Sequence, residues 1–334
     1  MPGIPARSTR LLDATRADHI AEAVRLLREG RLVAMPTETV YGLAADATDP
    51  VAVRGIFTAK GRPSDHPLIV HLPDASHLPR WAEDIPETAW RLAERFWPGP
   101  LTLLLRRAPH IDASVTGGRD SIGLRVPAHP VMRQVLQTLD GGLAAPSANL
   151  YQRLSPTTAA QVLAGLDGRI DAVLDGGPCA VGLESTIVDL TGTAPRVVRA
   201  GPITRGEIEA ALQVPVDMPA QHDTAVPGNV AVHYRPHTPL RMLDAATLEE
   251  RLATLPAHAR VAVMTYGTTL ARPAHAGIAA WVAMPEAKAD YARALYATLH
   301  ALDAAGAGEI WLQTPPRDEA WRDVHDRLAR ASAG

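Results

Sequence analysis

Cysteine is almost absent from this sequence of 334 residues, in which Cys179 is the only one. A single cysteine can form no disulfide within the chain and cannot supply a cysteine-based zinc site. Proteins that need no disulfides are typical of reducing compartments, so we expect a cytoplasmic protein. The first ten residues, MPGIPARSTR, also lack the apolar core of a signal peptide, which supports the same expectation.

Long apolar runs are absent as well. Hydrophobic residues make up 46% of the chain, but their runs are short and interrupted, far below the ~20 residues that cross a bilayer. We therefore expect no contact with a membrane. The formal net charge of -3 argues against a broad nucleic-acid-binding face and leaves room for a small basic pocket. A chain of this length can form two domains, each with its own core.

The usual short signatures of nucleotide and hydrolase sites are missing. The sequence contains no GxxxxGK(S/T) phosphate loop, no GxGxxG after a strand, no GxSxG elbow and no HExxH zinc motif. A nucleotide would have to be held by other residues. No paired Asp or Glu motif is evident either, so we expect no metal ligands from the chain itself.

What the sequence does contain is a cationic corner in the stretch KGRPSDHPLIVHL. Asp49-Pro50 predicts a helix start, because the carboxylate caps free amides and proline suits the first helical position. Gly61 can take the left-handed conformation that ends helices, which leaves Lys60 in the last turn and Arg62 just beyond it. Taken alone, such a pair of cations is more often a solvated surface corner. The motifs around it favour a phosphate site.

A second polar stretch, PTETVYGL, follows an apolar segment that predicts a buried strand from Leu32 to Met35. It offers two threonine hydroxyls, a carboxylate and a phenol before Gly42 lets the chain turn. Loops of this kind are often only turns. Arg125 closes the apolar stretch SIGLRV, and an arginine in a strand needs an anionic partner if it points inward.

Helix and strand patterns alternate along the first two hundred residues and predict a mixed α/β sheet. Further strands are expected at 67–72, 101–105, 121–126, 143–145, 172–174, 186–190 and 196–199, with helices that start near residues 86, 130 and 158. Several strands are flanked by Ser, Thr, Asn or Arg, as in APSAN, GLEST and RVVRAG. Polar loops beside an α/β sheet are a usual place for ligand sites.

Together these motifs resemble the threonylcarbamoyl-adenylate synthases, whose catalytic part is called the YrdC-like domain. The motifs PTETVYGL, KGRPSDHPLIVH, FWPGPLTLLL, SIGLRVP, APSAN with SPTTA, DGG with GLESTIVD, and RVVRAG occur in the family's order over about residues 10–205. The likeness continues through VPGNVAVHYRPHTPL, the linker of two-domain members. It implies a YrdC-like catalytic domain at 1–205, a linker or lid at 206–239 and a small Rossmann-like α/β domain at 240–334.

The resemblance implies an ATP-dependent nucleotidyltransferase, an L-threonylcarbamoyladenylate synthase. Such an enzyme joins L-threonine, bicarbonate and ATP into threonylcarbamoyl-AMP and releases pyrophosphate, with Mg2+ expected to accompany the ATP. The product would pass to the tRNA threonylcarbamoyl-transferase machinery, which makes threonylcarbamoyladenosine in tRNA. The expected contact of this chain with tRNA itself is weak.

By motif position, the resemblance carries the family's site residues onto this sequence. The threonine-binding positions are Thr39, His71, Arg125, Ala145 and Ser185. The ATP-binding positions are Lys60, Arg62, His66, Ser121, Ser147, Asn149, Ser155, Arg199, His233 and Tyr234. Lys60 and Arg62 are also the expected catalytic residues, because a reaction between two anions depends on the neutralisation of charge.

Two positions depart from the family pattern, and both concern nucleotide binding. His66 stands where an asparagine is usual, and Tyr151-Gln152 replaces a segment that commonly has a glycine. An imidazole can still donate a hydrogen bond, although its charge would respond to pH near ~6.5.

The segment at 214–239 is rich in proline and has little periodicity. Segments of this length are usually lids or tethers. We expect a lid from Val226 to Pro236, hinged at Pro227-Gly228, which brings His233 and Tyr234 near the nucleotide; a passive tether is the alternative. Strands expected at 240–243, 260–265 and 309–313 then alternate with helices near 247–255, 288–305 and 318–331, which predicts a parallel sheet.

Two other functions stay open from the sequence. The first is a double-stranded RNA or tRNA-binding module, against which the charge balance speaks. The second is a carbamoyl-transferase relative that uses carbamoyl phosphate. Such proteins carry zinc-finger domains, and one cysteine leaves no ligands for them.

Overall fold

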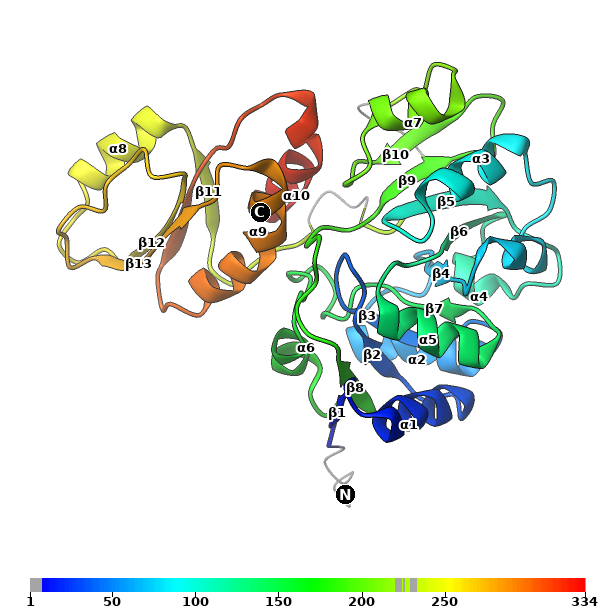
Figure 1. Cartoon of the computed structure of the whole chain (residues 1–334). Coiled ribbons are helices and arrows are strands. Elements are labelled where there is room, and N and C mark those ends of the chain that lie inside the picture. The colour runs from blue at the N-terminus through cyan, green and yellow to red at the C-terminus, as the bar shows by residue number, and fades with distance from the viewer. Residues whose placement is uncertain (1–7, 220–223, 225, 229–232, 334) are drawn as a thin grey trace. The chain divides into compact units, whose positions relative to one another are not determined.

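The computed structural model describes residues 8–219, 224, 226–228 and 233–333. The chain divides into two compact units (Figure 1). The first consists of Met1–Tyr151, Pro156–Ala180 and Glu184–Asn229, and the second of Gln152–Ser155, Val181–Leu183 and Val230–Gly334. The predicted domain limits at 205 and 239 stay predictions, because part of the predicted linker lies outside the described residues.

The first unit is built on a mixed sheet of ten strands in the order β1-β8-β2-β3-β7-β4-β6-β5-β9-β10. The strands are β1 (Arg10–Asp13), β2 (Val33–Met35), β3 (Gly42–Asp46), β4 (Ile69–His71), β5 (Leu101–Arg106), β6 (Ser121–Arg125), β7 (Leu143–Ala144), β8 (Ala172–Asp175), β9 (Thr186–Asp189) and β10 (Arg196–Arg199). β4 and β6 run parallel, whereas β5 and β6 run antiparallel. The predicted mixed α/β sheet is confirmed.

Helices pack on both faces of this sheet. They are α1 (Ala17–Arg28), α2 (Pro50–Lys60), α3 (Glu87–Phe96), α4 (Ala113–Thr116), α5 (Pro130–Leu139), α6 (Ala159–Leu166) and α7 (Arg205–Leu212), with a 3-10 helix η1 at Ala75–Arg80. α1 and α5 lie side by side (Figure 1) and share a core with Val33 of β2 and Leu174 of β8. α2, α3, α6 and α7 contribute to a larger core on the other face.

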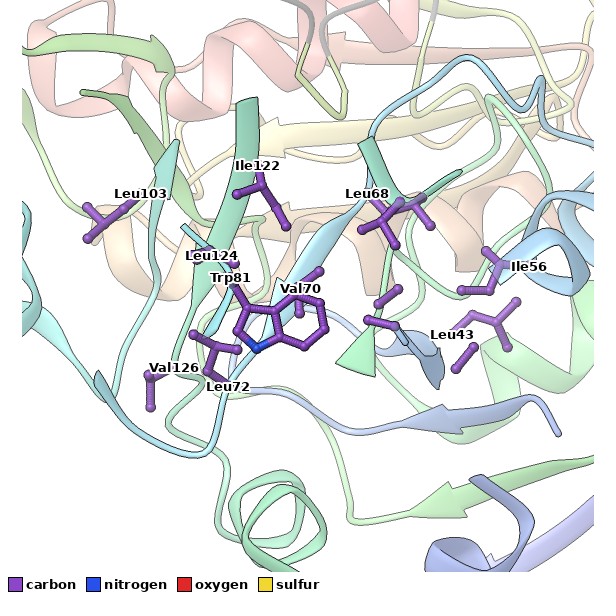
Figure 2. Close-up of a cluster of buried hydrophobic side chains, with 14 of the residues drawn as sticks. Leu43, Ile56, Leu68, Val70, Leu72, Trp81, Leu103, Ile122, Leu124 and Val126 are labelled. Atoms are coloured by element: carbon purple, nitrogen blue, oxygen red, sulfur yellow. The ribbon is translucent and has the colours of Figure 1, made fainter. Parts of the chain in front are cut away.

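The larger core surrounds the indole of Trp81, with Val70, Leu72, Leu124 and Val126 close by (Figure 2). All of these side chains are buried. Burial of an aliphatic side chain of this size stabilises the fold by about 1.5–3 kcal/mol. Because alternate residues of a strand point to opposite faces, this apolar packing also fixes which residues of β4 and β6 point away from it.

The corner that ends α2 has the predicted form. Asp49 Oδ1 accepts a hydrogen bond from the backbone N–H of Val51 at 2.8 Å, and Pro50 is the first helical residue. Gly61 follows the helix with a φ of 61°, in the left-handed region where a residue without a Cβ is least strained. Lys60 is therefore the last residue of the helix, as expected.

The second unit has a sheet of four strands in the order β11-β14-β12-β13, and all of its strand pairs are parallel. The strands are β11 (Leu240–Leu243), β12 (Val261–Tyr266), β13 (Ile278–Met284) and β14 (Glu309–Gln313). The helices are α8 (Ala245–Ala253), α9 (Lys288–Asp303) and α10 (Arg322–Ser332), with a 3-10 helix η2 at Glu319–Trp321. The predicted small parallel α/β domain is confirmed.

Three strands, β1, β3 and β13, are not predicted by the sequence pattern. β3 reads GLAAD, and glycine, alanine and aspartate are all poor strand formers. β1 buries one residue, Leu12, and β13 is mostly half-buried at the edge of its sheet, so neither shows a clear alternation. Pairing with a neighbouring strand makes these segments extended. Among the described residues, every helix is too short or too polar to cross a bilayer.

Replacement of Leu124 by Ala should lower the free energy of unfolding by about 2–5 kcal/mol, because it opens a cavity in a core where this residue is 0% exposed. Leu11→Ala is the matched control, since Leu11 lies on β1 with 56% of its surface exposed. Its loss should cost less than about 0.5 kcal/mol. Urea unfolding followed by circular dichroism measures both variants, and equal losses would contradict this packing.

Candidate active site

Two predicted site residues of the first unit, His71 and Arg125, lie on the face of the sheet opposite the larger core. His71 on β4 pairs in register with Arg125 on β6, and cross-strand partners point to the same face. Thr102 on β5 joins them, because its sequence neighbours Leu101 and Leu103 are in the larger core. This half of the sheet therefore has one apolar face and one face that carries polar groups.

Arg125 is the most heavily bonded of these groups. It is buried, with 4% of its surface exposed. Its Nε donates a hydrogen bond to the carbonyl of Gly99 at 3.1 Å, and its Nη1 donates to Thr39 Oγ1 at 3.0 Å. Its Nη2 lies 2.7 Å from Glu38 Oε1. Glu38 is thus the anionic partner that an arginine pointing inward from a strand needs.

The contact between Arg125 and Glu38 is an ion pair that is not aligned as a hydrogen bond. Among the described residues, neither Arg125 Nη2 nor either carboxylate oxygen of Glu38 has a hydrogen bond of good geometry. Glu38 is also buried, with 7% of its surface exposed. An unsatisfied buried polar group costs about 1–3 kcal/mol, so both side chains can gain by binding a further polar group.

The loop after β2 is fixed by the hydroxyl of Thr37. Thr37 Oγ1 accepts hydrogen bonds from the backbone N–H groups of Thr39 and Val40 at 3.1 and 3.2 Å. It lies 2.6 Å from the carbonyl of Val40, to which it donates. The interpretation of this loop as a simple turn holds for Thr37, but Thr39 and Glu38 reach out of the turn to Arg125.

His71 lies beside Arg125, and Ala145 follows β7, which pairs with β4. Burial, together with the nearby Arg125, lowers the pKa of His71 to about 3, so its ring is neutral at neutral pH. The backbone N–H of Ala145 donates to the carbonyl of Ile69 at 3.0 Å, which places the loop after β7 against β4. The neutral ring adds no second positive charge next to Arg125.

Ser185 and Arg199 form a second polar group. Arg199 donates from Nε to the carbonyl of Ser185 at 3.0 Å and from Nη2 to its Oγ at 2.9 Å. Ser185 Oγ also lies 2.8 Å from Thr102 Oγ1. An irregularity in the register between Val197 and Arg199 pairs Arg199 with Ile187. Val197 points into the larger core. The bulge shifts the alternation of side chains between the two faces of the sheet, so Arg199 points away from that core.

Lys60 is one of two lysines in the chain, and it is buried with 3% of its surface exposed. Its ammonium donates to the backbone carbonyls of Ser147 and Asn149, the latter at 2.6 Å. Burial, with a smaller contribution from Arg62, holds its pKa well below the usual value. Lys60 thus ties the end of α2 to the loop after β7, which carries two of the predicted nucleotide-binding residues.

Arg62 and Ser121 lie at the other end of the central strands. Ser121 begins β6 and Arg125 ends it, so about 13 Å of extended chain separates the two residues. Arg62 Nη2 donates to the carbonyl of Pro67 at 2.9 Å, which holds the guanidinium near the start of β4. Two of the predicted nucleotide residues, Arg62 and Ser121, therefore lie at the opposite end of the central strands from His71 and Arg125.

The positions that depart from the family pattern are close together. His66 packs edge-on against Tyr151, with 5.5 Å between the ring centroids. Burial, and next the charge of Arg62, lower the pKa of His66. Gln152 has a φ of 64°, in the left-handed region that glycine adopts without strain. That conformation is a physical reason for the glycine that the family commonly has in this segment.

Three predicted ATP-binding residues belong to the second unit. Ser155 is fully buried. The backbone N–H of His233 donates to the carbonyl of Arg330 at 3.3 Å. Tyr234 is 1% exposed, and the guanidinium carbon of Arg327 lies 5.3 Å from the centre of its ring. A role of these residues in nucleotide binding stays a prediction.

The predicted set leaves out Glu38 and two titratable groups near it, the buried Cys179 and the half-buried His129. Glu38 is a single carboxylate among hydroxyls, and nothing in its sequence context shows that it points inward. Burial, with a smaller contribution from the charge of Glu38, raises the pKa of Cys179 to about 12. Burial lowers the pKa of His129, and the negative charge of Glu38 partly opposes this shift. Glu38 is therefore flanked by a neutral thiol and a neutral imidazole at neutral pH.

In the described part of the chain, no three His, Cys, Asp or Glu side chains lie close enough together to hold a metal ion. An ion that arrives with a nucleotide would take most of its ligands from phosphate oxygens and water.

Two family models match the chain. The Sua5/YciO/YrdC model, described as "Telomere recombination", matches residues 25–201, and a model described as "Threonylcarbamoyl-AMP synthase, C-terminal domain" matches residues 203–333. The fold and the order of these matches define a class: proteins with a YrdC-type domain followed by a Sua5-type C-terminal domain.

Comparison with individual relatives shows which proteins of this class the chain resembles in sequence and structure. The threonylcarbamoyl-AMP synthase of Pyrococcus abyssi is 44% identical over 219 residues, which are 64% of each protein. That of Bacillus subtilis is 42% identical over 238 residues, 70% of this chain and 69% of the relative. The crystal structure of P. abyssi Sua5 complexed with L-threonine matches with a TM-score of 0.88 at 34% identity, over 97% of this chain and 98% of that one. The chain belongs to the Sua5-type threonylcarbamoyl-AMP synthases, an ATP-using family of nucleotidyltransferases.

Replacement of Lys60 by Met keeps the apolar stem and removes the donor shared by the carbonyls of Ser147 and Asn149. We expect turnover, measured as pyrophosphate release, to fall at least ~100-fold because the loop after β7 loses its anchor. Lys288→Met is the matched control, because Lys288 pairs with Asp323 at 2.6 Å in the second unit. Similar turnover of the two variants would argue against the anchor.

Proposed function

We propose that this chain makes threonylcarbamoyl-AMP and pyrophosphate from L-threonine, bicarbonate and ATP. The threonine amine and bicarbonate form a carbamate with the loss of water, and a carbamate oxygen then attacks the α-phosphate of ATP, from which pyrophosphate leaves. Because two anions meet, the reaction depends on positioning and on the neutralisation of charge. No nucleophilic side chain is needed, and the residues described above supply guanidinium groups at both ends of the central strands.

The observation that carries this proposal is the buried guanidinium of Arg125 with the hydroxyl of Thr39 beside it. A guanidinium can bind a carboxylate through two parallel hydrogen bonds, and a hydroxyl next to it suits a polar amino acid. We propose that L-threonine is held here by Thr39, His71, Arg125, Ala145 and Ser185. The P. abyssi structure that contains L-threonine supports this choice of ligand.

We propose that the nucleotide extends from this pocket toward the start of β4 and β6. Arg62 would neutralise phosphate charge there, and Lys60 would act chiefly through the loop that it anchors. The other proposed nucleotide contacts are His66, Ser121, Ser147, Asn149, Ser155, Arg199, His233 and Tyr234. Mg2+ would enter with the ATP and lower the charge of the phosphates; the side-chain roles proposed here do not depend on its position.

The product of this reaction is a labile mixed anhydride, so we propose that it passes directly to the machinery that modifies tRNA. A weak contact of the chain with tRNA fits its net charge of -3. We further propose a cytoplasmic location, which the single cysteine supports.

Substrate choice tests the threonine pocket. A site that hydrogen-bonds a hydroxyl rejects an isostere without it more strongly than an analogue without a methyl group. With ATP and bicarbonate, we expect L-serine to support slower pyrophosphate release than L-threonine, and L-valine to be at least ~100-fold slower than L-threonine. Omission of bicarbonate is the control, and the adenylate can be identified by mass spectrometry. Comparable rates with L-valine would show that the pocket is misplaced.

We propose that the segment from Val226 to Pro236 is a lid rather than a passive tether, although its residues 229–232 lie outside the described residues. Two contacts in the first unit support this proposal. Arg199 Nη1 donates to the carbonyl of Pro227 at 2.8 Å, and Val226 packs with Ile69 in a small apolar cluster. The start of the segment therefore contacts Arg199, one of the predicted nucleotide-binding residues.

A lid that closes over nucleotide should protect itself from protease. A non-hydrolysable ATP analogue with L-threonine should slow proteolytic cleavage within 214–239 by at least about fivefold, because cleavage follows the population of the open form. Mass spectrometry of the fragments locates the cut, and cleavage at sites outside this segment serves as the control. Cleavage at the same rate with and without the ligands would favour the tether.

A further inference from the structure

We propose that Glu38 recognises the α-ammonium group of the amino acid by an exchange of partners. Glu38 pairs with Arg125 in the structure; with an amino acid bound, the substrate carboxylate takes Arg125, and Glu38 takes the substrate ammonium. This inference rests on the proposed function, since it places an amino acid beside Arg125. It adds Glu38 to the binding residues and makes it the residue that selects for amino acids.

The geometry of Glu38 favours such an exchange. Glu38 and Thr39 are neighbours in the chain and contact two different nitrogens of the same guanidinium, at 2.7 and 3.0 Å. Both oxygens of Glu38 lack a well-aligned hydrogen bond within the described structure, and so does Arg125 Nη2. A substrate carboxylate can therefore approach Nη2 without the loss of an aligned hydrogen bond, and Glu38 keeps two oxygens to accept from an ammonium group.

The balance of charge gives the second argument. Of the described groups around Glu38, Arg125 is the positive one at neutral pH, because burial lowers the pKa of His129 and the thiol of Cys179 carries no charge. The buried pair of Glu38 and Arg125 is neutral overall. A zwitterionic amino acid leaves that balance unchanged, whereas a carboxylate without an ammonium group would add an uncompensated buried negative charge. Such a charge is costly away from water, so the pair selects for an ammonium group beside the carboxylate.

The test uses two ligands that differ in the ammonium group. (R)-3-hydroxybutanoate has the carboxylate, hydroxyl and methyl groups of L-threonine but no nitrogen. By calorimetry on the full chain without ATP and bicarbonate, L-threonine should bind the native protein at least ~10-fold more tightly than (R)-3-hydroxybutanoate. In Glu38→Gln, which keeps the shape and removes the charge, L-threonine should lose about 10- to 100-fold in affinity. The affinity for (R)-3-hydroxybutanoate should stay the same or rise, so the preference should disappear.

A second variant and the native protein keep the test decisive. Glu38→Asp retains the charge and should retain a preference for L-threonine. If Glu38→Gln weakens both ligands equally, the side chain only supports Arg125, and the inference is overturned. An unchanged preference in Glu38→Gln overturns it as well. If the variants do not fold, the native protein alone can decide: equal affinity for the two ligands would overturn the inference.

Failure of this inference is distinguishable from failure of the proposed function. Arg125→Ala should lose affinity for both ligands, because it removes the carboxylate partner that the two ligands share. If Arg125→Ala loses both while Glu38→Gln keeps its preference, the pocket is correct and Glu38 has no role in it. If the native protein binds no L-threonine and releases no pyrophosphate with it, the proposed function itself is wrong.

Discussion

A guanidinium buried in the middle of a sheet has to be compensated, and the site is arranged around that requirement. Arg125 is met by the carbonyl of Gly99, the hydroxyl of Thr39 and the carboxylate of Glu38. These groups come from the loop before β5 and the loop after β2, which are far apart in the sequence. Removal of one partner from a buried charge costs several kcal/mol, so the loops are held together by the charge that they surround. In the proposed exchange, a substrate carboxylate replaces Glu38 among these partners.

The two kinds of cation in the site have different tasks. The guanidinium of Arg125 presents a planar edge to a carboxylate, whereas the compact ammonium of Lys60 donates to two carbonyls of one loop. A sequence motif that contains both a lysine and an arginine suggests that both side chains bind phosphate. The burial of Lys60 shows why this interpretation is incomplete: an ammonium with 3% exposure first satisfies the backbone around it. In the proposed function, its influence on a nucleotide passes through Ser147 and Asn149.

Much of the fold could be predicted because apolar strands and helix ends leave local signals. The start of α2 at Pro50 and its end at Gly61 follow from residue chemistry alone. β3 could not be predicted, since its residues are small and become extended only by pairing with β2 and β7. The bulge before Arg199 and the inward turn of Glu38 also depend on partners distant in sequence. Recognition of the motifs led to the loops of the predicted site, but only the packing shows which side chains face one another.

The second unit includes more of the chain than its C-terminal part. The segment Gln152–Ser155 belongs to it, and the carbonyl of Gln152 accepts a hydrogen bond from the backbone N–H of Arg235 at 2.8 Å. Tyr234, with a φ of 58°, is buried beside this contact and packs on Tyr296 of α9. The loop that Lys60 anchors at Asn149 therefore continues into backbone that pairs with the segment around His233 and Tyr234. Loss of the segment around Arg235 would leave the carbonyl of Gln152 without this hydrogen bond, so that segment has a structural role within the second unit.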